Sequence, residues 1–145
     1  MRFPLFALSV FFLAACATSA TRPAEIARAD VSVALRAPLM FGSSRTAQAP
    51  MGVTVTNTAN VPVTVRRIRL SSPAMMDYEI RPVSAAFNDV LAPNASKTFV
   101  LLSQADSARA GLDPSEPLNV RAEVDFVAGK YKYREVFNVV AGTLR

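Results

Sequence analysis

The chain contains no histidine, no tryptophan and only one cysteine among its 145 residues. Without histidine it lacks the side chain that most often serves as a general base near neutral pH and as a metal ligand. A single cysteine cannot form a disulfide within the chain, so a folded domain has to be held together by its hydrophobic core. No serine lies in a Gly-x-Ser-x-Gly context, which argues against a serine hydrolase. These absences predict a protein that is not an enzyme and that has no cofactor and no metal site.

Long runs of one charge are also absent. The chain has 16 Lys and Arg against 11 Asp and Glu, a formal net charge of +5, but no run of five or more basic residues. Since nucleic-acid-binding proteins concentrate their basic residues, we expect no nucleic acid as a partner. The mild excess of positive charge is compatible with attraction to anionic lipid or polysaccharide, without specifying either.

The most apolar segment stands at the amino terminus. Arg2 precedes an apolar run over residues 5–15, which ends in Leu13-Ala14-Ala15-Cys16. A short cationic start, an apolar run of about 7–15 residues and small residues before a cleavage site are typical of a secretory signal peptide. The run is too short to span a bilayer, which needs roughly 20 apolar residues.

The motif Leu13-Ala14-Ala15-Cys16 resembles the lipobox of bacterial lipoproteins. The resemblance implies cleavage between Ala15 and Cys16 and attachment of diacylglycerol to the Cys16 sulfur, with fatty acyl chains such as palmitate as the membrane anchor. Two or three buried acyl chains make release from a membrane negligible. An ordinary signal peptide followed by an accidental cysteine is the alternative. The next residue is Ala17, not Asp, and by the enterobacterial sorting rule this implies the periplasmic face of the outer membrane.

The remaining chain is long enough for one domain. Removing residues 1–15 leaves 130 of the 145, which is a common size for a single domain. Residues 16–29 are rich in Ala, Thr and Ser, a composition typical of a flexible tether. We therefore expect a signal peptide helix over 1–15, a flexible tether over 16–29 and a folded domain over 30–145.

Within that domain, apolar and polar residues alternate in short segments that are separated by turn residues. Such alternation predicts strands, and the absence of any long helical pattern predicts an all-β fold, an antiparallel immunoglobulin-like β-sandwich of seven or eight strands. Residues 98–103 are apolar enough for a strand that is buried on both faces or packed deep in a sandwich. Residues 104–117 are expected to form a crossover loop with a helical turn. The expected segments are 31–35, 51–57, 61–70, 76–81, 87–91, 98–103, 118–126 and 130–140.

Two local features of these strands can be predicted. The alternation changes phase at Arg66-Arg67, which indicates a β-bulge because a one-residue slip would otherwise turn every side chain to the other face. A two-residue loop at Ala128-Gly129 would pair Asp125 with Lys132 on the outer face of a hairpin. A bulge or a three-residue loop is the alternative there, because Ala128 disfavours the positive φ of a type I′ turn.

Two stretches resemble bacterial immunoglobulin-like and fibronectin III-like modules over about residues 30–141. They are the strand-turn-strand segment from Asn57 to Val65, and Leu91-Ala92-Pro93-Asn94-Ala95-Ser96 with its Leu-x-Pro-x-x-Ser pattern. The resemblance implies a fold and no activity. The Cys…Trp…Cys core of antibody domains is absent, which excludes that branch of the fold.

Candidate site residues are few. Arg66, Arg67 and Arg69 form the densest basic cluster, and guanidinium groups bind carboxylates or phosphates through paired hydrogen bonds. A solubilising face is the alternative for these arginines. Two weaker alternatives are glycoside hydrolysis by paired carboxylates and copper binding by methionines, for which the candidates are Met40, Met51, Met75 and Met76. A copper site of this kind pairs methionine with histidine, which the chain lacks. The carboxylate pairs are Asp77/Glu79 and Glu123/Asp125, and both lie beside basic residues on expected solvent faces.

These observations predict a lipoprotein of the bacterial cell envelope, bound to the membrane through Cys16, that acts as a binding or structural module without catalysis. The expected partner is a protein or another envelope component that contacts a sheet edge or loops. The segment 76–81 is the candidate edge, because Pro82 restricts it to an edge or an end. The alternative is a periplasmic accessory protein that works as a chaperone or carrier.

Overall fold

The computed structural model describes residues 29–41, 43–73, 78–107 and 118–143. These ranges contain eight strands and no helix, so they hold no helix long and apolar enough to span a membrane. The predicted signal peptide helix, and all of the predicted tether except residue 29, lie outside the described residues. The strands are β1 (Ala29–Leu35), β2 (Thr46–Asn57), β3 (Val63–Ser71), β4 (Tyr78–Ile80), β5 (Val83–Leu91), β6 (Ser96–Ser107), β7 (Leu118–Ala128) and β8 (Tyr131–Thr143).

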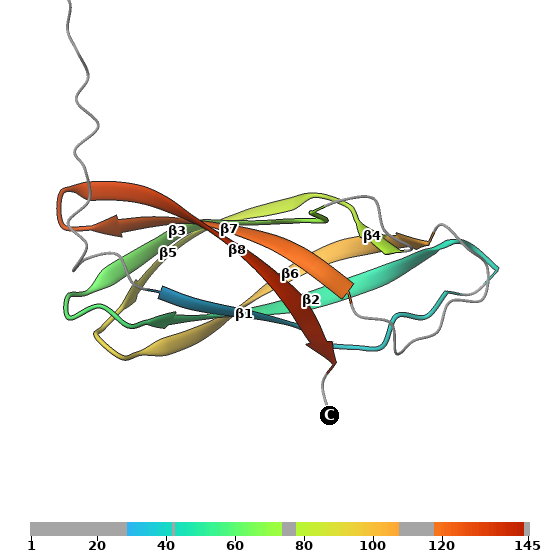
Figure 1. Ribbon diagram of the computed structural model, residues 1–145, viewed down its shortest axis with the longest axis horizontal. Coiled ribbons are helices and arrows are strands. Elements are labelled where there is room, and N and C mark those ends of the chain that lie inside the picture. Colours follow the sequence, from blue (N-terminus) through green and yellow to red (C-terminus); the bar gives the residue numbers. More distant parts are fainter. Residues whose placement is uncertain (1–28, 42, 74–77, 108–117, 144–145) are drawn as a thin grey trace, which may run out of the picture.

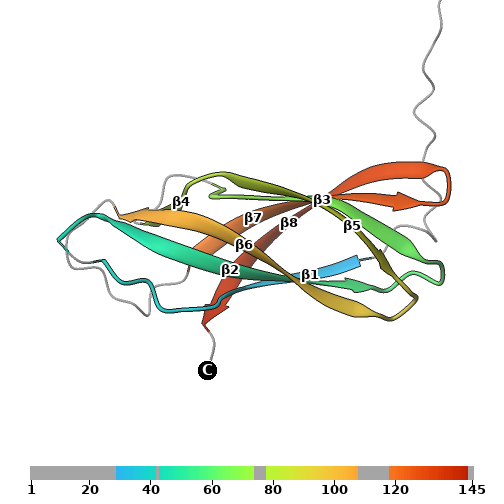
Figure 2. The same cartoon turned by 180° about the vertical axis from the view of Figure 1, so that it is seen from behind.

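The strands form two layers that face each other (Figures 1 and 2). One layer has the order β4-β6-β2-β1, and the other has the order β8-β7-β3-β5. This division is that of an immunoglobulin-like sandwich, in which strands A, B, E and D form one sheet and strands C, F and G form the other. The places of A, B, E and D are taken by β1, β2, β6 and β4, and those of C, F and G by β3, β7 and β8. The remaining strand, β5, is added beside β3. The prediction of an all-β immunoglobulin-like fold is therefore confirmed.

The sequence predicted a wholly antiparallel sandwich, and this prediction is wrong at one pairing. The carboxyl end of β8 leaves its layer and runs beside β1 in the same direction, where Ala34 pairs with Gly142 and Leu35 with Thr143. The other strand pairings in the described ranges are antiparallel. Strand alternation reports which face a side chain occupies but not the direction of a neighbour, so this parallel contact had no signal in the sequence. It joins the two layers into one continuous strand order.

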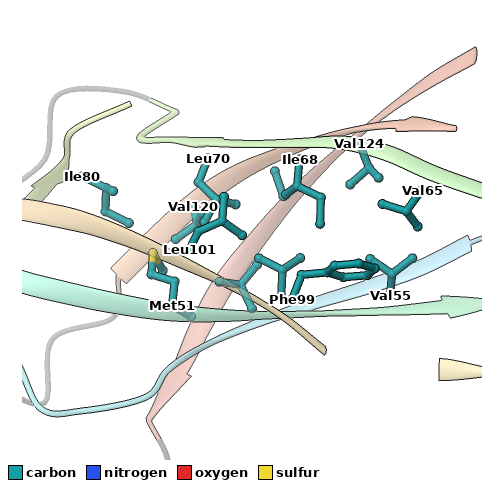
Figure 3. Close-up of a cluster of buried hydrophobic side chains, with 14 of the residues drawn as sticks. Met51, Val55, Val65, Ile68, Leu70, Ile80, Phe99, Leu101, Val120 and Val124 are labelled. Carbon is teal, nitrogen blue, oxygen red and sulfur yellow. The ribbon is translucent and has the colours of Figure 1, made fainter. Parts of the chain in front are cut away.

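The core lies between the layers. Figure 3 shows Ile68 and Val124 of one layer pointing toward Met51 and Phe99 of the other. Each strand contributes alternate residues, as the predicted alternation requires, and Val53 and Val55 are fully buried. Burial of apolar surface contributes about 25 cal/mol per Å² and is the main stabilising term in a domain with no disulfide.

Several strands are longer than predicted. β2 begins at Thr46 rather than near Met51, and β6 continues to Ser107 through residues expected to form a loop and a helical turn. These extensions pair with each other, from Thr46 opposite Asp106 to Pro50 opposite Leu102. Their inward residues are small, Ala47, Ala49, Ser103 and Ala105. Small buried residues produce little hydrophobic alternation, so the sequence pattern ended too early.

Of the two arrangements expected for residues 98–103, burial on both faces is wrong, and the strand packs into the sandwich through one face. Phe99 and Leu101 are buried, but Val100 and Leu102 are 46% and 72% exposed on the outer face of β6. A continuous apolar run does not distinguish a strand between two layers from a strand in an outer layer with apolar residues toward solvent. β5 was also underestimated, because it covers nine residues rather than 87–91.

The predicted bulge is present, and the predicted hairpin register is wrong. The ladder of β3 with its neighbours shifts between Val65 and Arg67. In the hairpin, Gly129 has a φ of 57°, and Ala128 pairs with Tyr131. The turn is therefore Gly129-Lys130, and the pairing is displaced by two residues from the prediction. Glycine at the first central position is typical of a type II′ turn.

The start of β1 and the β7–β8 turn lie at the same end of the sandwich, which we name the Ala29 end. Ala29 pairs with Asn57, whose side chain donates a hydrogen bond to the Leu91 carbonyl oxygen over 3.0 Å. Leu91 pairs with Val63, and the next residue of β3 pairs with Val127 next to the turn. The chain therefore enters the domain at this end.

Candidate functional site

On the outer face of β3, β7 and β8, basic side chains outnumber carboxylates. We call it the basic face, and it consists of Arg66, Arg67, Arg69, Arg121, Glu123, Asp125, Lys132 and Arg134. It has six basic side chains and two carboxylates. The rest of the described chain has five basic and five acidic residues. The net positive charge of the described residues therefore lies on this one face.

Two carboxylates at the centre of the basic face hold three arginines. Asp125 accepts a hydrogen bond from Nε of Arg134 at 2.7 Å and lies 3.1 Å from Nη1 of Arg69. Glu123 lies 3.2 Å from Nε of Arg121 and 3.7 Å from Nη1 of Arg134. Strand pairing explains the geometry, because Asp125 stands directly between Arg67 on β3 and Arg134 on β8.

The pairing fixes the charge of Asp125 and Arg134. Burial by itself would raise the pKa of Asp125, but the hydrogen bond from Arg134 and the charges of Arg69 and Arg134 outweigh it and leave the pKa below its ordinary value. The hydrogen bond and charge of Asp125 raise the pKa of Arg134. Both groups are consequently ionised at neutral pH.

Three other cations of the basic face have no carboxylate partner among the described residues. Arg66 donates a hydrogen bond from Nη1 to Oδ1 of Asn88 on β5. Arg67 and Lys132 have neither an ion pair nor a hydrogen bond from their side chains within the described ranges. These three side chains therefore keep charge that is available to a ligand.

A groove of about 480 Å³ lies where two of these cations meet. Its charged lining residues are Arg66, Lys132, Arg134 and Asp125, and Phe126, Val127 and Tyr133 complete it. The bulge places Arg66 there: Val65 pairs with Phe126 and Arg67 with Asp125, so Arg66 is the extra residue that opposes no residue of β7. Bulges commonly redirect a side chain in this way.

The sequence predicted part of this site. Arg66, Arg67 and Arg69 do lie on one face, but they have different surroundings: Arg66 lines the groove, Arg67 is exposed, and Arg69 is paired with Asp125. Lys132 and Arg134 were not recognised as part of the same site. Their outward alternation in the hairpin was a usable signal, but only the pairing of β3 with β7 brings them to the arginines.

The remaining candidates do not form a second charged site. Cys16 and Ala15, the predicted lipidation and cleavage residues, lie outside the described residues, as do Asp77 and Met76. Met51 belongs to the core. In the part of the chain that the structure describes, no three His, Cys, Asp or Glu side chains gather in an arrangement that could hold a metal ion.

A second groove of about 300 Å³ lies near the β4–β5 junction, lined by Arg81 among others. Its charge is compensated, because Asp106 accepts hydrogen bonds from Arg81 Nε at 2.6 Å and from Arg81 Nη2 at 3.1 Å. The Oγ1 of Thr46 donates a third at 2.7 Å. The hydrogen bonds from Arg81 and Thr46 keep the pKa of Asp106 below its ordinary value.

The predicted edge segment 76–81 does lie at an edge in its described part. β4 is the first strand in the sheet order and pairs only with β6. It has three residues, however, and the Ile80 N–H already donates to the Ser72 hydroxyl at 2.7 Å. So short an edge offers few free backbone groups to a partner strand.

No family model and no curated protein matches this chain. A solved structure of a Bordetella pertussis protein described as ApaA matches with a TM-score of 0.51 and 13% identity, over 81% of this chain and 94% of that one. The exo-β-N-acetylglucosaminidase of Vibrio harveyi matches with a TM-score of 0.46 and 13% identity, over 82% of this chain but 19% of that one. A PapD-like domain of human CEP192 matches with a TM-score of 0.35 and 10% identity, over 98% and 99% of the two chains. At these identities the first match supports the β-sandwich fold alone.

Proposed function

We propose that this chain is a lipoprotein of the bacterial cell envelope, anchored through Cys16 at the periplasmic face of the outer membrane, and that it acts by binding rather than by catalysis. Its binding surface is the basic face, and its partner is an anionic envelope component. The observation that supports this proposal is the concentration of the net charge of the described residues on the outer face of β3, β7 and β8.

The chemistry of the basic face favours binding over catalysis. Arginine is charged at every physiological pH, and its planar guanidinium forms paired hydrogen bonds with carboxylates and phosphates. The carboxylate in the groove, Asp125, has a lowered pKa because of Arg134 and Arg69, which makes it a poor proton acceptor at neutral pH. Such groups hold an anion in place without exchanging protons with it.

A sheet edge is the alternative binding surface, and it is the one that a chaperone or carrier would use. β5 is the longer edge, with nine residues. Its Asp89 forms an ion pair with Lys97 of β6, and it alternates with the core-facing residues Phe87 and Leu91. Inward-pointing charges on an edge strand oppose pairing with another strand. The basic face is therefore the better candidate.

The anchor is tested by replacing Cys16 with Ser and fractionating the cells. We expect the parent chain in the envelope fraction and a large part of the variant in the soluble periplasmic fraction. A variant that stays wholly with the envelope, as the parent does, would contradict a lipid anchor on Cys16.

The binding surface is tested by crosslinking in intact cells with a chain that carries Arg67→Gln and Lys132→Gln. Neither side chain has an internal partner among the described residues, so their loss should weaken capture of partners without weakening the fold. A matched control carries Arg36→Gln and Arg45→Gln, which remove the same charge from exposed positions outside the basic face. Equal capture by the two double variants would overturn the role of the basic face.

A further inference from the structure

We infer that the groove beside the β3 bulge binds the phosphate of an anionic lipid headgroup, and that this contact holds the basic face against the membrane surface. The inference rests on the proposed function, since it takes the lipid anchor on Cys16 as the reason the domain stays near a bilayer. It adds the ligand class and the residues that bind it: Arg66, Lys132 and Arg134.

The charges of the groove fit a phosphate. Arg66 from β3 and Lys132 from β8 reach it from opposite sides of β7, and neither has a carboxylate partner in the described ranges. Asp125 is the acidic residue that lines the groove, but its carboxylate already forms ion pairs with Arg134 and Arg69. A guanidinium that can form paired hydrogen bonds, next to a compact ammonium charge, is a combination that suits phosphate oxygens.

Two of the three cations, Arg66 and Arg134, are held in position before a ligand arrives. Asn88 accepts a hydrogen bond from Arg66, and Asp125 accepts one from Arg134 at 2.7 Å. The rings of Phe126 and Tyr133 are stacked with centroids 5.3 Å apart, next to these residues. A site that is ordered in advance loses less conformational entropy when it binds.

The position of the groove in the domain favours a membrane as the source of the phosphate. The groove contains Val127 and Lys132, which pair with each other two residues from the β7–β8 turn, at the Ala29 end. The chain from Cys16 enters the domain at the same end, and the 13 residue steps from Cys16 to Ala29 reach at most about 45 Å. A 13-residue strand such as β8 is itself roughly 43 Å long. The Ala29 end is therefore the part of the domain that an anchored chain brings most easily to the headgroups.

The basic side chains around the groove also favour a lipid bilayer over a single small anion. Arg67 is exposed beside the groove and has no partner in the described ranges, and it can meet a second headgroup when the first occupies the groove. A membrane presents many phosphates in one plane, and each basic side chain near an anionic leaflet adds to its attraction.

The test uses the full-length gene product, purified from expressing cells and reconstituted in vesicles of phosphatidylcholine alone or with a minority of phosphatidylglycerol. An amine-reactive reagent labels lysines, and mass spectrometry compares Lys132 with Lys97, which forms an ion pair with Asp89 and does not line the groove. We expect phosphatidylglycerol to reduce the labelling of Lys132 several-fold relative to Lys97. Equal labelling of Lys132 in both kinds of vesicle would overturn the inference.

Matched variants and competitors identify the ligand. Arg66→Gln should abolish the protection of Lys132, whereas Arg45→Gln should leave it unchanged; circular dichroism checks that both remain folded. Protection by inorganic phosphate in phosphatidylcholine vesicles, to the same extent as by phosphatidylglycerol, would assign the groove to a free anion instead. Protection by soluble polyglutamate but not by phosphatidylglycerol would assign it to an acidic protein. Each of these two results overturns the lipid assignment, and the proposed function still stands if Cys16→Ser releases the chain from the envelope.

Discussion

The side-chain amide of Asn57 donates a hydrogen bond to the Leu91 carbonyl oxygen over 3.0 Å, which ties the end of β2 to the end of β5. The same amide donates to the Val61 carbonyl oxygen at 2.9 Å, and its Oδ1 accepts the Ala59 N–H at 3.0 Å. Asn57 is only 1% exposed, so water cannot replace these partners. One asparagine therefore fixes the loops that carry the chain between the two layers at the Ala29 end.

Replacing Asn57 with Asp should destabilise the domain by about 2–4 kcal/mol. The carboxylate has the same shape but cannot donate, so two carbonyl oxygens lose their partner and face a buried negative charge. Urea unfolding followed by circular dichroism measures the free energy. Asn60→Asp is the matched control, because Asn60 is exposed, and it should change stability by less than about 0.5 kcal/mol. Equal effects of the two variants would contradict the role given to Asn57.

Gly129 is the residue that the β7–β8 turn requires. Its φ of 57° lies in the left-handed region, where a Cβ costs about 1–2 kcal/mol. A Cβ at this position would meet no atom within 4 Å, so the loss in Gly129→Ala would come from the backbone alone. We expect Gly129→Asn to lose less, because asparagine tolerates this conformation better.

Gly142→Ala is the control for that turn. Gly142 also has open space around its Cβ position but is not among the residues with positive φ. Thermal unfolding of the three variants should place Gly129→Ala lowest. A Gly142→Ala variant that is destabilised as much would show that the turn geometry is not the cause.

The sequence predicted which face each residue occupies better than which residue it pairs with. The inward faces of residues 53–55 and 118–126 were correct because alternation is a local property. The hairpin register was displaced by two residues, and a shift of two leaves every face unchanged. Charge pairing could not distinguish the two registers either, because Asp125 opposes a cation in both: Lys132 in the predicted register and Arg134 in the observed one.

The candidate site was predicted in part for the same reason. Arg66 and Arg67 are adjacent in sequence, and the break in alternation at these residues correctly located the bulge. The groove needs Lys132 and Arg134 as well, which are more than 60 positions away and reach Arg66 only through β7. Pairing between distant strands depends on the packing of the whole sandwich, and no local pattern at Arg66 contains it.

Phe87 and Phe99 close one side of the sandwich, with ring centroids 4.7 Å apart and planes tilted by 58°. Tilted aromatic pairs contribute about 0.5–1.5 kcal/mol beyond the apolar area that they bury. A double-mutant cycle with Phe87→Leu and Phe99→Leu, measured by urea unfolding, should therefore give a coupling energy of about 1 kcal/mol. Phe126→Leu with Phe87→Leu is the control, because Phe126 stacks on Tyr133 instead, and the two changes should be additive.

Stability should fall in acid because of two aspartates on different layers. Arg134 and Arg69 lower the pKa of Asp125, against the opposing effect of burial, and Arg81 and Thr46 lower that of Asp106. A carboxyl whose pKa is lower in the folded state than its unfolded value of about 3.9 stabilises the fold above that value. This contribution is lost as the pH falls through the folded pKa, because the proton then binds both states.

The urea midpoint should accordingly be nearly constant from neutral pH to about pH 5 and should decrease below about pH 4. Asp106→Asn should make the decrease shallower, since asparagine does not titrate. Arg81→Gln should do the same, because Arg81 provides the first cause of the lowered pKa of Asp106. Each of the two variants removes the same ion pair, one through its carboxylate and the other through its guanidinium. If only one of them changes the pH profile of the parent, the Arg81–Asp106 contact does not control acid stability.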